Sequence, residues 1–170
     1  RRLVASPRLF SLLVAAAALA IASVGDGFLY LALQDRVSLN VGLFPLLFVA
    51  TALAYMVLAV PAGRLADRFG RLPVFLAGYG FLLLIYGVLL LPPLGGVEIV
   101  ICLTFLGAYY AATDGVLMAA ASTLIPPGLR TTGLAFVTTV TSLGRMASSV
   151  LFGAVWTWQG LDVAIAVFGA

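Results

Sequence analysis

The chain has 170 residues, of which 64% are hydrophobic and 9% are charged, whereas soluble domains carry about 25% charged residues. This composition excludes an ordinary soluble domain and predicts an integral membrane protein whose first partner is the lipid bilayer. The net charge is +3, with no histidine and Cys102 as the one cysteine, so we expect no His/Cys metal site, no cofactor and no nucleic-acid partner.

Apolar runs divide the chain into six predicted membrane helices, since a span needs about 20 mostly apolar residues. They are 9–33, 40–62, 73–92, 96–124, 129–157 and 161–170. Prolines and glycines at 92–96 and 126–128 mark the links between them. Because the sixth run is too short to span and the chain opens without Met, we expect a fragment of a longer polytopic protein.

The arginines predict how these helices are oriented. Seven of the nine would lie on one side of the membrane, which the positive-inside rule assigns to the cytoplasm: Arg1, Arg2, Arg8, Arg64, Arg68, Arg71 and Arg130. Arg36 would lie on the other side, where Trp156 and Trp158 suit an outer aromatic belt. The N-terminus is therefore predicted to be cytoplasmic. As a separate expectation, the membrane is a bacterial inner membrane.

An Asp-Gly pair occurs inside two predicted helices, at Asp26-Gly27 and at Asp114-Gly115. If residues 1–93 and 94–170 are repeated units, these positions correspond, although the two helices cross the membrane in opposite directions. Inverted three-helix repeats are a common plan of secondary transporters. A shared dipeptide also arises by chance, so the fold class rests on composition: an all-α polytopic bundle, with two inverted repeats as a further expectation.

The segment 61–71, PAGRLADRFGR, concentrates charge between two uncharged runs. Gly63, Asp67, Gly70 and Arg71 give the pattern G-x-L-x-D-x-x-G-R. This pattern resembles the signature loop of the major facilitator superfamily. The segments GDGFLYLALQD and GAYYAATDG are similar to the seventh and tenth helices of bacterial members. The resemblance implies that the chain is one six-helix half, the C-terminal one, of a twelve-helix transporter, and that the absent N-terminal half is a partner.

The resemblance also implies a cytoplasmic latch in this segment. In the family, the loop aspartate faces a helix of the other half, and a loop arginine meets an acid on the fourth helix of its own half. Asp114 matches that acid, so Arg68 or Arg71 is expected to reach it. The expected gating residues are Gly63, Arg64, Asp67, Arg68, Gly70, Arg71 and Asp114. A simpler interpretation is that the arginines only set topology, but topology requires neither the glycines nor Asp67.

Charged groups inside a membrane are costly and usually functional. Asp26 and Arg145 lie at depths that differ by about 3 Å at 1.5 Å per residue, so we expect them to pair, as the first and fifth helices of a half pack together in the family. The pair either joins two helices permanently or binds a solute or a coupling proton.

The fifth predicted helix carries a polar face of about 120°, at 100° per residue. It holds Thr138, Thr141, Ser142, Arg145, Ser148 and Ser149. Such a face either lines a watery cavity or joins helices, and six polar residues around an arginine favour the cavity. Tyr30 shares a face with Asp26, and Tyr110 with Asp114. The uncharged third helix is expected to face lipid.

The predicted function is one half of a secondary transporter that moves a small solute by alternating access, with proton coupling through Asp26 or Asp114 as a hypothesis. The expected solute and coupling residues are Asp26, Tyr30, Tyr110, Thr138, Thr141, Arg145 and Ser148. The alternative is a membrane scaffold or assembly subunit that transports nothing. We expect no enzyme, because no Ser/His, Cys/His or paired-acid site is visible.

Overall fold

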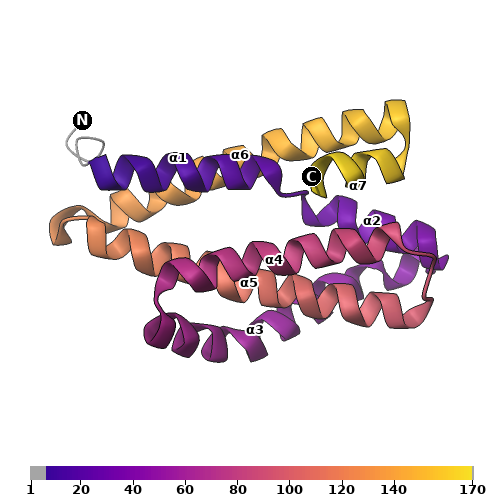
Figure 1. Cartoon of the computed structure of the whole chain (residues 1–170), viewed down its shortest axis with the longest axis horizontal. Coiled ribbons are helices and arrows are strands. Elements are labelled where there is room, and N and C mark those ends of the chain that lie inside the picture. The colour runs from indigo at the N-terminus through magenta and orange to yellow at the C-terminus, as the bar shows by residue number, and fades with distance from the viewer. Residues whose placement is uncertain (1–6, 170) are drawn as a thin grey trace.

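The computed structural model describes residues 7–169, and over that range every regular element is a helix. The helices are α1 (Pro7–Ala22), α2 (Asp26–Val37), α3 (Phe44–Phe69), α4 (Arg71–Leu90), α5 (Gly96–Leu124), α6 (Arg130–Gln159) and α7 (Leu161–Gly169), with short 3₁₀ turns at Val41–Leu43 and Pro127–Leu129 (Figure 1). The predicted placement of Arg1 and Arg2, the side chain of Arg8, and Ala170 lie outside the described residues.

Five helical segments are long and apolar enough to cross a membrane. They are Leu9–Val37, Val41–Phe69, Arg71–Leu90, Gly96–Leu124 and Pro127–Gln159. The prediction of an all-α polytopic bundle is confirmed, and five of its six expected spans are found. The sixth run appears as α7, whose 9 residues are fewer than the roughly 20 that a span needs.

The first span is not one helix, although a single helix over 9–33 was expected. It is divided into α1 and α2 by a break at Ser23, Val24 and Gly25. Gly25 is extended, with φ −67° and ψ 141°, and precedes the first residue of α2, Asp26. The break therefore places Asp26 in the first turn of a helix, inside a membrane span.

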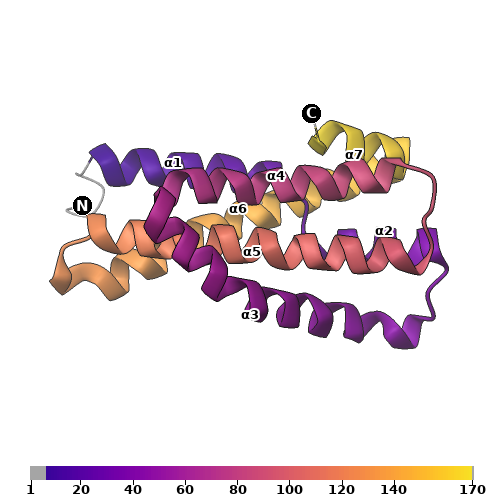
Figure 2. The same ribbon diagram turned by 60° about the horizontal axis from the view of Figure 1, so that its bottom comes forward.

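The charged segment 61–71 is mostly helix and not a loop. α3 continues through Pro61 to Phe69, and Gly70 alone separates it from α4. Gly70 has φ +98°, a conformation that side chains disfavour. Figure 2 shows that the last part of α3 turns away from the line of the rest, and a proline within a helix is the usual cause of such a bend. This sharp reversal explains the glycine at position 70.

The helices pack closely where glycines face their neighbours. A Cβ on Gly107 of α5 would lie 2.5 Å from Ala54 Cβ of α3, and one on Gly78 of α4 would lie 2.7 Å from Thr113 Cγ2 of α5. A Cβ on Gly144 of α6 would lie 2.9 Å from Ala20 Cβ of α1. Small residues allow such approach in membranes. The last contact confirms the expected packing of the first and fifth spans.

The expectation that the third span faces lipid is only half right. One side of α4 exposes leucines, such as Leu83 and Leu84, but the other side buries Leu82, Ile85 and Tyr86 in the core. The most exposed span is Val41–Phe69, with 11% of its apolar window buried. Periodicity could not show this, because α4 is hydrophobic all round.

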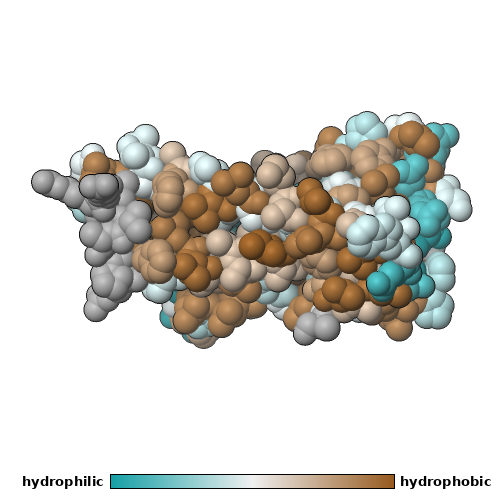
Figure 3. All heavy atoms as spheres, turned by 90° about the horizontal axis from the view of Figure 1, so that it is seen from above, coloured by the Kyte–Doolittle hydropathy of each residue, from teal (hydrophilic) through white to brown (hydrophobic). Residues whose placement is uncertain are grey.

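Apolar side chains cover the middle of the face in Figure 3, and hydrophilic residues gather at one end. At that end α2 leads towards α3, and α4 leads to α5 (Figure 1); we call it the Arg36 end, after the arginine in the last turn of α2. The opposite end, where Gly70 joins α3 to α4, is the Arg71 end. An apolar belt beside a polar end matches a chain that spans a bilayer.

Candidate functional site

A hollow of about 350 Å³ lies between α2, α3 and α5 within the spans. Its lining residues are Asp26, Tyr30, Phe48, Thr51, Ala52, Tyr55, Tyr110 and Asp114. Asp26 and Tyr30 are one turn apart on α2, and Tyr110 and Asp114 are one turn apart on α5, so each pair shares a helix face. The two Asp-Gly positions thus meet at one site.

A chain of polar contacts joins the two carboxylates behind this hollow. The Tyr110 hydroxyl donates a hydrogen bond to Asp26 Oδ1. Arg145 of α6 donates from Nη2 to Asp114 Oδ1 at 2.6 Å, and its guanidinium carbon lies 5.4 Å from the centre of the Tyr110 ring. These four residues, Asp26, Tyr110, Arg145 and Asp114, form a polar chain across three helices, and we call them the polar chain below.

The ion pair in this chain differs from both expected pairings. Arg145 was expected to pair with Asp26, and Asp114 with Arg68 or Arg71, but Arg145 pairs with Asp114. The Asp26 carboxylate accepts its hydrogen bond from Tyr110. Depth along the helices does not determine which acid Arg145 meets, because the partner depends on how α2, α5 and α6 pack together.

Buried hydroxyls from two other helices hold the break between α1 and α2. Tyr86 of α4 accepts a hydrogen bond from the Val24 backbone N–H at 2.9 Å, and Ser148 of α6 donates one to the Ser23 carbonyl. A Cβ on Gly25 would collide with Ser149 Oγ. Backbone groups freed by a broken helix must be satisfied inside a membrane. These contacts therefore fix where α2 begins, and with it the position of Asp26.

Tyr30 and the α3 residues complete the wall of the hollow. The Tyr30 hydroxyl donates to Thr51 Oγ1 at 2.9 Å, and Thr51 Oγ1 donates to the Leu47 carbonyl at 3.0 Å. The rings of Tyr30 and Phe48 are 4.4 Å apart between centres. Sequence reasoning missed Phe48, Thr51 and Tyr55. A signal existed, because Thr51 and Tyr55 are the only polar side chains from Phe44 to Val60 and are one turn apart.

The polar residues of α6 make three kinds of contact: with the helix break, with Asp114, and with carbonyls of α6 itself. Ser148 is fully buried at the helix break, and Arg145 belongs to the polar chain. Thr138 and Thr141 donate to carbonyls of their own helix, Leu134 at 3.1 Å and Val137 at 3.1 Å. None of these four lines the hollow, whereas Asp26, Tyr30 and Tyr110 do. Asp114, expected in the gate, also lines it.

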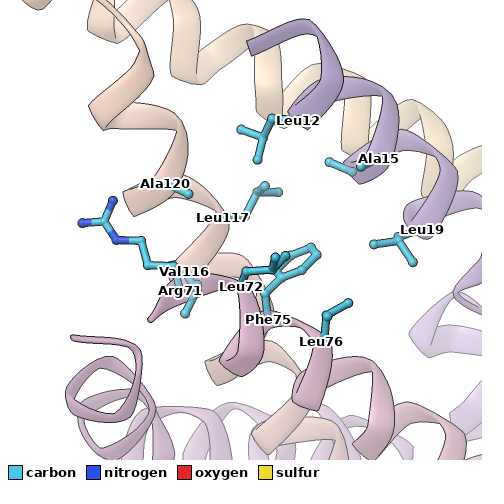
Figure 4. Close-up of a pocket in the computed structure, with 11 residues that line it drawn as sticks. Leu12, Ala15, Leu19, Arg71, Leu72, Phe75, Leu76, Val116, Leu117 and Ala120 are labelled. Atoms are coloured by element: carbon cyan, nitrogen blue, oxygen red, sulfur yellow. The ribbon is translucent and has the colours of Figure 1, made fainter. Parts of the chain in front are cut away.

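Arg71 attaches the Arg71 end of α4 to α5. Its Nη1 donates to the Ala119 carbonyl at 2.7 Å and lies 3.5 Å from Thr123 Oγ1. Arg71 therefore contacts the fourth span, as expected, but it binds the Ala119 carbonyl of that helix and not the Asp114 carboxylate. Arg71 also borders an apolar cavity of about 280 Å³ between α1, α4 and α5. Figure 4 shows its guanidinium pointing away from this cavity, which offers a solute no polar group.

The other expected gating residues are exposed or line a small hollow between α3 and α5. Arg64 and Asp67 are exposed, and Arg68 lies over the Phe69 ring at 5.3 Å. Among the described residues Asp67 has no ion-pair partner. Gly63 and Asp67 line a hollow of about 290 Å³ between α3 and α5, and a Cβ on Gly63 would meet nothing within 4 Å. Contacts among residues 7–169 therefore do not explain why Gly63 and Asp67 are present.

A second ion pair, missed by sequence reasoning, lies at the Arg36 end. Arg36 Nε donates to Glu98 Oε1 at 2.7 Å, and the Glu98 side chain is fully buried. Arg36 also donates to the Leu91 carbonyl, and Glu98 Oε2 accepts from the Leu94 N–H at 3.1 Å. The signal was an acid in the first turn of one helix and a base in the last turn of another. The pair ties α2 to the link between α4 and α5.

Comparison with family models finds a match to the Major Facilitator Superfamily over residues 9–170. Comparison with curated proteins and with solved structures finds no match. The match covers nearly the whole chain and agrees with the resemblance carried by Gly63, Asp67, Gly70 and Arg71. The chain belongs to the Major Facilitator Superfamily.

Proposed function

We propose that the chain is one six-helix half of a secondary active transporter, which moves a small solute by alternating access. The observation that carries this proposal is the polar chain beside the hollow. Asp26, Asp114 and Arg145 all lie inside helices that are long and apolar enough to span a membrane. Such groups are costly in lipid and are kept where they face a solute path or each other. Family membership supports the same class of function.

The proposed solute path runs over the face formed by α2, α3 and α5, and the other half of the transporter covers it. The exposed rings and carboxylates there would otherwise meet lipid. The Arg71 end is cytoplasmic in this proposal, in a bacterial inner membrane. Gly63, Asp67 and Arg68 belong to a latch whose counterpart lies on the other half, since Asp67 has no ion pair among the described residues.

Proton coupling through Asp26 is the second part of the proposal. The Asp26 carboxylate accepts a hydrogen bond from the neutral Tyr110 hydroxyl and forms no ion pair with a described arginine. Asp26 can therefore bind and release a proton without breaking the Arg145–Asp114 pair. Flux should respond to an imposed pH gradient in the wild type and not in Asp26→Asn. Unchanged flux with unchanged pH dependence in that variant would remove Asp26 from this role.

The test of transport uses the full-length protein in proteoliposomes. Uptake is measured with labelled members of four classes: a quaternary ammonium, a carboxylic acid, an amino acid and a hexose. Arg145→Ala should abolish the flux that is found, while Leu84→Val on the exposed side of α4 should leave it unchanged. The scaffold alternative predicts no flux of any class, with Arg145→Ala acting only on assembly.

A further inference from the structure

We propose that the hollow between α2, α3 and α5 binds an organic cation, an amine or quaternary ammonium group attached to a small apolar body. This inference rests on the proposed function and names the class of its solute. Three properties of the hollow support it: its charge, its aromatic wall and the hydrogen-bonding groups that it leaves unused.

The charge of the site is negative once its contacts are counted. Arg145 forms an ion pair with Asp114, with Nη2 2.6 Å from Oδ1, so the two residues together carry no net charge. Asp26 accepts a hydrogen bond from the neutral Tyr110 hydroxyl, and no described arginine forms an ion pair with it. Arg36 is bound to Glu98, and Arg71 to the Ala119 carbonyl. When Asp26 is ionised, one carboxylate charge therefore remains at the hollow with no ion-pair partner among the described residues.

The wall of the hollow is rich in aromatic rings, from Tyr30, Phe48, Tyr55 and Tyr110. Phe48 and Tyr55 keep 47% and 38% of their surface exposed, so their ring faces are available to a ligand. Ring faces attract cations, and more strongly when water is excluded. Tyr110 already stacks with the Arg145 guanidinium at 5.4 Å, so this wall accepts positive charge in the structure itself.

The hydrogen-bonding groups also favour a cation over an anion or a sugar. The hydroxyl protons of Tyr30, Thr51 and Tyr110 are already donated to protein acceptors. Among the lining side chains the Tyr55 hydroxyl is the one donor with no hydrogen bond to a described residue, so the unused carboxylate oxygens of Asp26 and Asp114 outnumber the unused donors. An anion needs donors, and a sugar needs donors and acceptors together. The volume of about 350 Å³ lies at the small end of ligand pockets.

The test measures binding to the full-length protein in detergent by isothermal titration calorimetry. Three probes share a benzyl group and differ in charge: benzyltrimethylammonium, benzyl alcohol and benzylsulfonate. The cation should bind about tenfold or more tightly than either other probe. Equal affinity for the cation and the alcohol, or preference for the sulfonate, would overturn the proposal.

Variants assign the binding to this hollow. Asp26→Asn should weaken cation binding about tenfold, whereas Asp35→Asn, the same change on exposed α2 surface outside the hollow, should not. Tyr55→Leu should weaken binding severalfold and Tyr55→Phe should not, because only the first removes the ring. Size-exclusion profiles show that each variant is folded. Full cation affinity in folded Asp26→Asn contradicts the proposal.

Failure here is distinct from failure of the transport proposal. If proteoliposomes take up a carboxylic acid or a hexose and Arg145→Ala abolishes this, transport stands and the cation inference is wrong. If the cation binds and no solute crosses, the transport proposal is wrong and the binding site remains. If a basic side chain of the other half instead forms an ion pair with Asp26, the wild type should bind no cation. That result would also overturn the inference.

Discussion

Arg145 on α6 donates a hydrogen bond to Asp114 on α5 across 2.6 Å, and this contact links α6 to the site formed by α2, α3 and α5. Neither side chain is fully buried, with exposed fractions of 35% and 44%. The pair therefore lies at the surface that the other half of the transporter is proposed to cover, which makes it available to the transport cycle.

Neutralising either partner should impair transport, because the other is left as a lone charge inside a span. Asp114→Asn and Arg145→Gln are each expected to lower flux about tenfold or more. The fold-loss of flux in the double variant should be smaller than the product of the two single fold-losses, which corresponds to a coupling energy of about 1 kcal/mol or more. Flux in proteoliposomes of the four proteins gives this cycle. Strictly multiplicative losses contradict a functional pair.

Removing the Tyr86 hydroxyl should destabilise the helix break. Tyr86→Phe leaves the buried Val24 N–H without its partner, at a cost of about 1–3 kcal/mol. Thermal unfolding in detergent measures the loss. The control is Thr104→Val, which removes an exposed hydroxyl bonded only within its own helix and should change little. Equal stability of the two variants would show that the break does not depend on Tyr86.

Breaking the Arg36–Glu98 pair should be the most destabilising of these changes. The Glu98 side chain is fully buried and Arg36 is 12% exposed, and removing one partner of a buried pair costs about 3–5 kcal/mol. Arg36→Gln should lower the unfolding temperature strongly. Asp35→Asn alters the neighbouring, exposed residue and should leave it unchanged. A small effect of Arg36→Gln would mean that water reaches Glu98 in the membrane.

Two glycines of the signature segment should respond differently to alanine. Gly70 has φ +98° and ψ 154°, a region populated almost only by glycine, so Gly70→Ala should cost about 1–3 kcal/mol and lower the unfolding temperature. A Cβ at Gly63 meets nothing within 4 Å, so Gly63→Ala should leave stability unchanged or raise it by about 0.5–1 kcal/mol. If the latch proposal holds, Gly63→Ala still lowers flux. Unaltered flux in that variant removes Gly63 from the latch.

The sequence predicted the class of fold and the main side chains of the site, but not their pairing. Composition and apolar runs located five spans, and intramembrane charge singled out Asp26, Asp114 and Arg145. The break at Ser23–Gly25 was missed, because a serine, a valine and a glycine occur in many unbroken spans, and this break depends on hydroxyls from distant Tyr86 and Ser148. The proposed inverted repeat stays a prediction.

The most direct test of alternating access is the reactivity of a cysteine placed in the hollow. Ala52 lines it and is exposed, so Ala52→Cys in the full-length protein without other reactive cysteines reports on access to water. Leu83→Cys, on the exposed apolar side of α4, is the control and should stay unreactive. A membrane-impermeant maleimide should label Ala52→Cys from either side of the membrane, and bound solute should slow the labelling. Labelling from neither side would show that the hollow is a closed helix interface and contradict the transport site.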